Sequence, residues 1–100
     1  MVNFEWDENK NRINERKHGI SFELARSVFD DDGALLFDDP EHSTDEERFL
    51  IIGYAKNVRI CIVSHCYRDN DVIRIISARE ATKSEKQVYR KWNGGYDYER

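Results

Sequence analysis

The sequence predicts a single α+β domain with two N-terminal helices, an antiparallel meander of about four strands and a C-terminal helix. Three observations lead to this fold class. Residues 7–29 contain helix caps and a helical apolar pattern, residues 34–78 contain four strand-like runs separated by short polar turns, and helical spacing returns over residues 80–92. A chain of 100 residues has room for one core. We therefore expect one domain over residues 1–92 and a flexible tail over residues 93–100.

Two helices are expected near the N-terminus. The first begins after Asp7, a favourable N-cap, and ends before Gly19, a residue type that commonly follows a helix. Its apolar face is weak and consists mainly of Ile13. Ser21 caps the second helix. The apolar residues of this second helix recur at three- and four-residue spacing and are Phe22, Ala25, Val28 and Phe29.

The middle of the chain changes to a strand-like composition. The expected strands cover residues 34–37, 48–55, 58–68 and 72–78. The dipeptides "KN" and "DN" between the later runs are typical of tight hairpin turns. Consecutive strands would then pair as antiparallel neighbours.

The last periodic segment, residues 80–92, predicts a closing helix. One face of this helix would carry Ala81, Glu85, Val88, Tyr89 and Trp92. The following "NGGYDYER" has no apolar period and is expected to fray.

The charge of the chain is unevenly distributed. The net charge is −4, which by itself argues against a polyanionic partner. Residues 30–47 hold nine acids and no Lys or Arg, so the rest of the chain has 16 basic and 11 acidic residues, a net of +5. An acidic belt is thus inserted into a basic body, which could face phosphate. The belt is interpreted either as a partner-facing edge or as a solvated loop.

The sequence has no sign of a membrane span or an export signal. No run of about 18 apolar residues occurs, and the N-terminus has neither a basic flank nor an apolar signal region. We expect a soluble, cytoplasmic protein. Cys61 and Cys66 lie five positions apart on one expected strand, so their side chains would point to opposite faces and could not bridge each other. Buried free thiols are the expectation.

Assumed hairpin registers bring cationic side chains together. If the second and third strands pair through a two-residue turn at 56–57, and Tyr67 lies opposite Val72, then Arg48 lies opposite His65 and His65 opposite Arg74. These three side chains would share one face. The other face would carry Phe49, Ile51, Ile60, Ile62, Ile73 and Ile75.

Such a cluster fits phosphate chemistry. Guanidinium groups match phosphate oxygens with two parallel hydrogen bonds, and imidazole transfers protons near neutral pH. Together they could cleave RNA without a metal by activating the ribose 2′-hydroxyl and stabilising the charge that grows on phosphate. A plainer interpretation is that the arginines pair with carboxylates and the histidine is structural. A register shift of one residue would scatter the cluster.

Other chemistries fit less well. Cys66 and His65 are adjacent in a strand and therefore face opposite ways, so a thiol-imidazole pair is not expected. His42 stands among several acids, yet the spacing matches no established metal-binding pattern, and a solvated turn is the simpler interpretation. The sequence has no phosphate-cradling glycine loop and no zinc pattern. We expect no metal and no cofactor.

Three stretches resemble one known family. "FEWDENKNRINERKHGISFELARSVFDD", "DPEHSTDEERFLIIG" and "RIISAREATKSEKQVY", in this order, are similar to the BrnT toxins of bacterial type II toxin-antitoxin systems. The resemblance implies a RelE-like fold, RNA cleavage that arrests growth, and a BrnA-type antitoxin that supplies the DNA-binding function. It also implies a homodimer within the toxin-antitoxin complex as a further expectation. The family-like positions are Lys17, His18, Arg48, His65, Arg68, Arg74, Ser77 and Arg79.

We assign expected roles to these positions. Arg48 and Arg74 would bind the scissile phosphate, and His65 would transfer protons. Substrate binding is expected from Lys17, His18, Arg68 and Arg79, with Lys17 and His18 also as second contributors to proton transfer. Ser77 could cap the last helix, and Arg79 could brace its first turn against the acidic belt.

Two further hypotheses follow from the charge distribution. The alternative function is a non-catalytic module whose basic face binds an antitoxin or nucleic acid. The antitoxin itself is expected either to cover the acidic stretch around residues 38–47 with basic side chains or to fill the cationic face and block it.

Overall fold

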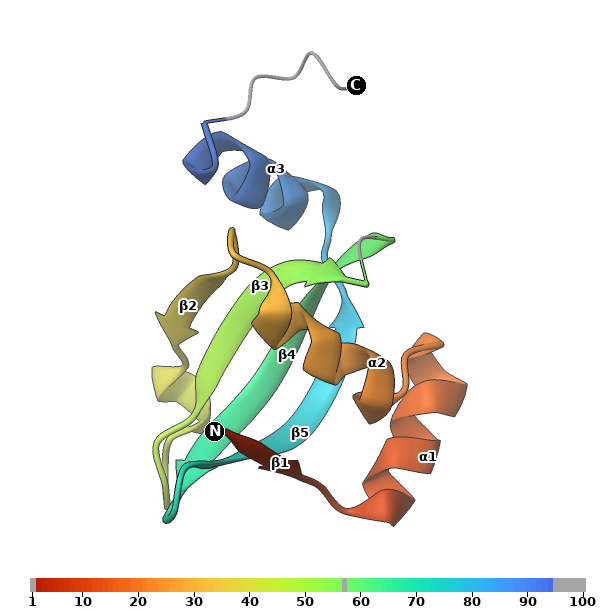
Figure 1. Cartoon of the computed structure of the whole chain (residues 1–100), viewed down its shortest axis with the longest axis vertical. Helices are drawn as coiled ribbons and strands as arrows, with labels where there is room; N and C mark the ends of the chain where they lie inside the picture. Colours follow the sequence, from red (N-terminus) through yellow and green to blue (C-terminus); the bar gives the residue numbers. More distant parts are fainter. Residues whose placement is uncertain (1, 57, 95–100) are drawn as a thin grey trace.

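The computed structural model describes residues 2–56 and 58–94, and within them it shows an α+β domain built on a five-stranded mixed sheet (Figure 1). The strands follow the order β1-β5-β4-β3-β2 across the sheet. Their bounds are β1 Asn3–Glu5, β2 Leu35–Asp38, β3 Phe49–Ala55, β4 Arg59–Arg68 and β5 Val72–Glu80. The helices are α1 Glu8–His18, α2 Phe22–Arg26 and α3 Lys83–Trp92, with 3-10 turns η1 Ser27–Asp30 and η2 Pro40–His42.

The expected α+β class and the antiparallel meander β2-β3-β4-β5 are confirmed, and the strand count is corrected. β1 adds a fifth strand, which pairs parallel to β5 through Asn3–Glu5 and residues 72–74. Three residues before a helix cap are too few to show a strand period, so β1 could not be predicted. Residues 95–100 of the expected tail lie outside the described residues. No helix in the described part is long and apolar enough to span a membrane.

The α1 helix has the predicted ends but not the predicted buried face. The Asp7 side chain accepts hydrogen bonds from the N–H groups of Asn9 and Lys10, and Gly19 adopts φ +71° after the last turn. Ile13 is 47% exposed, whereas Asn14 is buried. The Asn14 Nδ2 donates to the Ala78 carbonyl at 2.9 Å, and its Oδ1 accepts from the Ala78 N–H at 3.1 Å. An amide side chain therefore joins α1 to β5.

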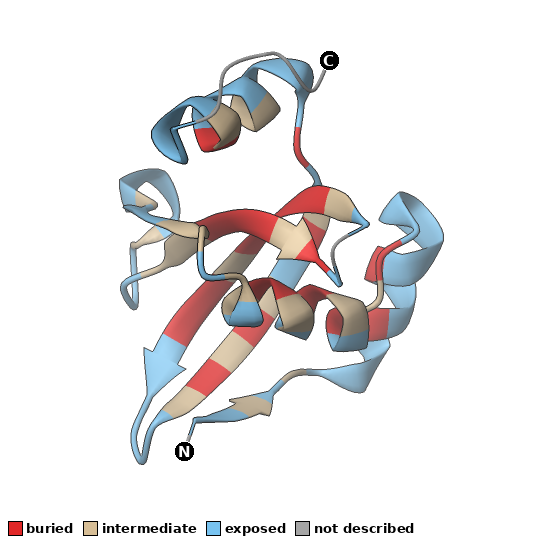
Figure 2. Ribbon diagram, turned by 45° about the horizontal axis from the view of Figure 1, so that its top comes forward, coloured by how far each residue is buried: buried red, intermediate tan, exposed pale blue. Residues whose placement is uncertain are grey.

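One face of the sheet is covered by α2 and η1. Phe22, Ala25 and Val28 have no exposed surface, which confirms the apolar pattern predicted for the second helix. They pack against Ile51 and Val63 of the sheet, and the buried stripes of β3 and β4 lie beneath this helical layer (Figure 2). This covered face contains the larger of the two apolar clusters.

The hairpin registers differ from the predicted ones by one residue. Ala55 lies opposite Arg59, and Arg68 lies opposite Val72, so each turn contains three residues. Lys56 has φ +48° and Asn70 has φ +64°, and left-handed residues of this kind are characteristic of three-residue hairpins. Asn57, part of the expected "KN" turn, lies outside the described residues.

Relative to the predicted register, this shift places the side chains of β4 on the opposite faces of the sheet from those expected beside β3 and β5. His65 lies opposite Phe49 and Ile75 and therefore faces the layer of helices. Arg48 and Arg74 stay on the other face, so the expected convergence of Arg48, His65 and Arg74 is wrong. The expected apolar layer is wrong for the same reason. Its β4 members belong to a second cluster, which is made of Ile52, Ile60, Ile62, Ala81 and Tyr89.

A bulge interrupts β5. Ser64 pairs with Ser77 and His65 pairs with Ile75, which leaves Ile76 without a partner. The extra residue allows both Ile75 and Ala78 to enter the covered core although they are three positions apart. The extra residue also reverses the side-chain alternation beyond it. Ser77 and Arg79 therefore point to the opposite face from the one that they would occupy in a regular strand.

The α3 helix is capped by Thr82 and not, as predicted, by Ser77, which lies within β5. Thr82 and Glu85 form a reciprocal capping box. The Tyr89 hydroxyl donates to Asp31 Oδ2 at 2.7 Å and anchors the helix to the chain before β2. In Figure 1, α3 lies at one end of the sheet. Its Tyr89 packs with Ile52, Ile60 and Ile62, on the face opposite α2. The rest of that face is called here the open face, and it is the part of the sheet where a functional site could lie.

Candidate active site

The open face of the sheet carries a pocket of about 360 Å³. It lies between the end of α1, the turn η2 and the three central strands. Cationic, imidazole and hydroxyl groups surround an apolar floor. Its lining residues are His18, Asp39, Glu41, His42, Arg48, Leu50, Ile62, Ser64, Ile76, Ser77, Ala78 and Arg79. Three of the seven predicted site residues, His18, Arg48 and Arg79, therefore meet here.

His18 reaches the pocket because α1 is tied to β5. The Asn14 side chain binds both backbone groups of Ala78, one turn before the end of the helix. Gly19 then takes a left-handed conformation that ends α1 directly after His18. The imidazole is consequently held beside the residues that follow the β5 bulge.

The segment before β3 is folded back on itself by one serine. The Ser43 hydroxyl donates to the Asp39 carbonyl at 2.7 Å and accepts from the Arg48 N–H at 2.9 Å. The Asp39 N–H also donates to the Arg48 carbonyl at 2.9 Å. These three bonds place the turn that carries His42 next to the start of β3.

His42 is oriented by a carboxylate. Its Nδ1 lies 3.0 Å from Asp39 Oδ2, and the Asp39 side chain is largely buried while the imidazole is exposed. An ionised carboxylate only accepts hydrogen bonds, so Nδ1 carries the proton and Nε2 is left as a proton acceptor.

Arg48 presents an unsatisfied donor. Its Nε is buried and makes no hydrogen bond within the described part of the chain. A buried charged donor without a partner is costly, because its lost hydration is not replaced. Arg48 also lines the pocket with His42 and forms no ion pair with the described residues, so its guanidinium charge is available to an anion in this pocket.

Arg79 already forms an ion pair with a carboxylate. Its two terminal nitrogens donate to the two oxygens of Glu85 at 2.9 and 3.0 Å. This contact lowers the pKa of Glu85 to about 2, because the hydrogen-bonded guanidinium favours the ionised form. Arg79 therefore braces the first turn of α3, as predicted, although through Glu85 and not through the acidic belt.

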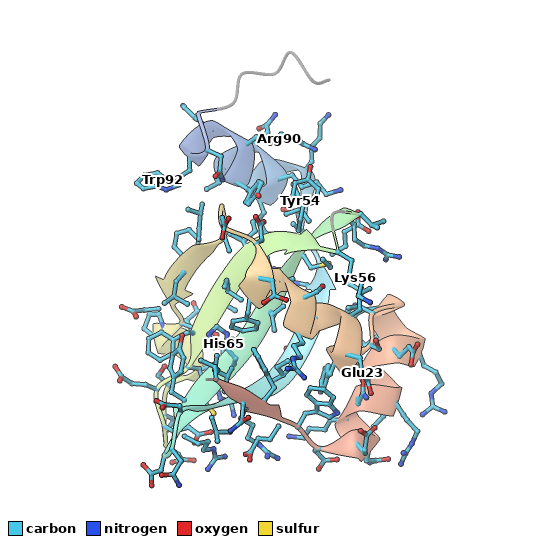
Figure 3. The ribbon with its side chains drawn as sticks, in the orientation of Figure 1. Glu23, Tyr54, Lys56, His65, Arg90 and Trp92 are labelled. Atoms are coloured by element: carbon cyan, nitrogen blue, oxygen red, sulfur yellow. The ribbon has the colours of Figure 1, made fainter. Side chains whose placement is uncertain are left out.

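His65 lies outside the pocket and has no exposed surface. Its Nδ1–H donates to the Val63 carbonyl at 3.1 Å, and its Nε2 accepts from the Tyr67 hydroxyl at 3.2 Å. The rings of Phe29 and Phe49 pack around it, and Figure 3 shows it within the cluster of side chains over the lower part of the sheet. Burial lowers its pKa, although the bond to Val63 partly opposes this shift.

The other predicted cations also lie away from the pocket. Arg74 pairs with Glu5 of β1 at 2.9 Å, and Arg68 lies 3.7 Å from Glu46. Lys17 is exposed in the last turn of α1. The structure thus does not bring Lys17, Arg68 or Arg74 into the group formed by His18 and Arg48.

The two thiols are buried and free, as predicted from the sequence. Cys61 belongs to the covered core, and Cys66 on the opposite face lies 3.5 Å from Glu46. Burial raises the pKa of Cys61 to about 11 and also raises that of Cys66. Neither thiol has the low pKa that a nucleophile needs at neutral pH. Among residues 2–56 and 58–94, no three His, Cys, Asp or Glu side chains are arranged to hold a metal.

Comparisons with known proteins identify the family. The family described as "Ribonuclease toxin, BrnT, of type II toxin-antitoxin system" matches residues 6–85, which is most of the chain. The chain belongs to the BrnT family. A comparison with curated proteins gives no significant match. The crystal structure of the Brucella abortus ribonuclease toxin BrnT is similar at 25% identity and a TM-score of 0.66, over 83% of this chain and 100% of that chain.

Membership of the BrnT family confirms the resemblance found in the sequence. The chain is a ribonuclease toxin of a type II toxin-antitoxin system, so its substrate is RNA and its partner an antitoxin. Sequence reasoning missed Asp39, His42 and Ser43, because the acidic stretch around them looked like a solvated loop. The helix-compatible "PEH" after Asp39 was the only signal that could have placed His42 on an ordered turn.

Proposed function

We propose that the open-face pocket cleaves RNA without a metal ion, by attack of a ribose 2′-hydroxyl on the adjacent phosphate. The bond between the 2′-oxygen and phosphorus forms while the bond between phosphorus and the 5′-oxygen breaks. The products are a 2′,3′-cyclic phosphate and a free 5′-hydroxyl. Such a reaction needs a base, an acid and a cation at the phosphate.

His42 is the base. Its Nε2 accepts the proton of the 2′-hydroxyl, and Asp39 at Nδ1 stabilises the imidazolium that results. Asp39 acts as a positioning residue, since it touches the imidazole and not the substrate. This arrangement fixes the tautomer before the substrate arrives.

His18 is the acid. It stands on a different wall of the same pocket, at the end of α1, and its imidazolium form donates a proton to the departing 5′-oxygen. Base and acid on separate walls suit a phosphate bound between them, because the attacking and leaving oxygens lie on opposite sides of the phosphorus. Lys17, the preceding residue, is proposed to contact the RNA backbone beside it.

Arg48 neutralises the phosphate. The charge on its non-bridging oxygens grows during attack, and the guanidinium of Arg48 has no ion pair with the described residues that would compete for it. This unpaired arginine in a pocket with two imidazoles is the observation that carries the proposal. Arg68 remains a proposed backbone contact, and Arg74, which was expected at the scissile phosphate, is now proposed as a second one. Their partly exposed ion pairs are weak enough to yield to phosphate.

Metal independence follows from this division of roles. Side chains of the chain supply the base, the acid and the charge stabilisation, which are the functions that a divalent ion would otherwise provide. The resemblance to BrnT toxins further suggests a BrnA-type antitoxin, through which DNA contact occurs indirectly, and a homodimer within the toxin-antitoxin complex.

The test is cleavage of a defined RNA by the purified chain in EDTA, with analysis of the ends produced. We expect cleavage to persist in EDTA and to leave 2′,3′-cyclic phosphate and 5′-hydroxyl ends. Loss of cleavage on chelation, with recovery on adding Mg²⁺, would reject the metal-free mechanism. Salt-sensitive binding of RNA without any cleavage would favour the alternative, a non-catalytic binding module.

A further inference from the structure

A second hollow on the open face is almost entirely apolar. It measures about 260 Å³ and lies between β2 and α3, above β3 and β4. Glu85 is the only charged residue of its lining. The lining residues are Phe37, Leu50, Ile52, Ile62, Glu85 and Val88. We call this the β2-α3 groove.

Large apolar side chains along this groove remain open to solvent. Phe37 is 45% exposed and Val88 is 51% exposed. Trp92, one turn beyond Val88 on the same helix stripe, is 74% exposed and projects outward from α3 (Figure 3). Exposed apolar side chains that gather beside an apolar hollow are typical of an interaction site.

One edge of the groove is formed by β2, which lies inside the acidic belt, where residues 30–47 contain nine acids and no Lys or Arg. Asp38 points to the other face of β2 from Phe37, and Asp32 and Glu41 lie before and after the strand, so these acids flank the groove without lining it. None of the three forms an ion pair with the described residues. A partner in the groove therefore needs basic side chains on the side that faces β2.

We infer that the β2-α3 groove binds an amphipathic segment of the antitoxin, with apolar side chains against Phe37 and Val88 and basic side chains against the acidic belt. A toxin of this class has an antitoxin as its partner, and the groove combines the apolar area with the charge that such a segment would complement. Of the two expected antitoxin surfaces, the acidic stretch is therefore assigned.

The position of the groove also explains neutralisation. Leu50 and Ile62 line both the groove and the catalytic pocket, so a segment bound in one extends over the mouth of the other. The antitoxin then competes with RNA for access to His42 and Arg48. This consequence rests on the function proposed above, whereas binding in the groove does not.

The experiment measures affinity for the full-length antitoxin, taken as the neighbouring gene product that restores growth when co-expressed. We expect Val88→Asp to weaken binding at least about tenfold, as expected for a charge placed in a buried hot spot. Added salt should also weaken binding, because it screens the attraction between the acidic belt and the basic side chains of the partner. The matched control is Ile13→Asp, which places the same charge at an equally exposed apolar position on α1 and should leave affinity unchanged.

A second measurement keeps the inference testable if Val88→Asp does not fold. The chain has two tryptophans, so Trp6→Phe leaves Trp92 as the only indole. Antitoxin should shift the Trp92 emission to shorter wavelength and protect it from acrylamide quenching. Unchanged Trp92 emission in the complex, or parental affinity of folded Val88→Asp, would overturn the inference.

The remaining outcomes separate the two proposals. If Val88→Asp dissolves a dimer of the free chain while antitoxin affinity is parental, the groove holds a second copy and the inference is wrong. If the parental chain binds antitoxin through the groove but does not cleave RNA, the proposed catalysis fails and the docking surface stands. Competitive inhibition of RNA cleavage by the antitoxin, lost in Val88→Asp, supports both.

Discussion

Two histidines of the chain differ mainly in their access to solvent. His42 is exposed, borders the pocket and is held by Asp39, whereas His65 is enclosed by aromatic rings and bonded at both nitrogens. An imidazole must reach the substrate before its acid-base chemistry matters. Burial therefore favours His42 over His65 as the proposed proton-transfer residue.

The role of Asp39 can be tested by Asp39→Asn. The amide keeps the shape but removes the charge that stabilises the imidazolium of His42, so kcat should fall about 10- to 100-fold with little change in KM. A fall in kcat at unchanged KM and unchanged melting temperature is a result that a purely structural role would not give. Glu41→Gln is the matched control, since Glu41 lines the same pocket but makes no hydrogen bond to the His42 ring. A parental kcat in Asp39→Asn would contradict the assignment.

His65 predicts a pH dependence of stability. Its pKa is lowered in the folded chain from 6.5, so the unfolded chain binds more protons below that value. The free energy of unfolding should therefore be highest above pH 6.5 and should decrease as the pH falls through 6.5. Urea titrations of the parent and of His65→Gln between pH 7.5 and 5.5 measure this, and the variant should show the smaller decrease. Equal pH dependence in both would refute it.

At the scale of elements, the ends of α1 were predictable, whereas the start of α3 and the strand registers were not. Asp7 and Gly19 mark α1 through local cap chemistry, which involves neighbouring residues only. The register of β4 depends on three-residue turns in which Lys56 and Asn70 adopt left-handed backbone without being glycine. A two-residue turn was an equally good interpretation of "KN". One added residue moved His65 to the other face.

The tie between α1 and β5 can be tested with Asn14→Ala. This change leaves buried backbone groups of Ala78 and Ile20 without partners, at a cost of about 2–4 kcal/mol in the free energy of unfolding. Ile13→Ala, at an exposed neighbouring position, should change stability by no more than about 0.5 kcal/mol. Chemical denaturation of both variants measures their free energies of unfolding. Similar losses in the two variants would show that the hydrogen bonds of the Asn14 side chain contribute little to stability.

The brace of α3 can be tested with Arg79→Ala. Because the ion pair with Glu85 is partly exposed, its loss should reduce stability by only about 1 kcal/mol. Cleavage should fall a few-fold, since Arg79 borders the pocket without holding the reacting groups. Lys86→Ala removes the neighbouring pair with Glu80 and is the control for helix stability. A loss of activity as large as that of Arg48→Ala would instead make Arg79 a phosphate ligand.

At the scale of the whole molecule, the two faces of one sheet have different tasks. The covered face holds the core under α2 and η1, and the open face combines a polar pocket with an apolar groove. The net charge of −4 gave no sign of this division. It averages an acidic stretch, residues 30–47, with a remainder of the chain that is net basic. The family and its chemistry could be inferred from sequence motifs. The face on which His65 lies could not, because it depends on the register of β4.

The most direct test compares RNA cleavage by His42→Ala and His65→Ala at a temperature where both are folded. The account predicts that His42→Ala slows cleavage by about 10²- to 10⁴-fold with an unchanged melting temperature. His65→Ala should melt earlier and, while folded, cleave at close to the parental rate. The opposite pattern, with an inactive folded His65→Ala and a nearly parental His42→Ala, would contradict the placement of catalysis in the open-face pocket.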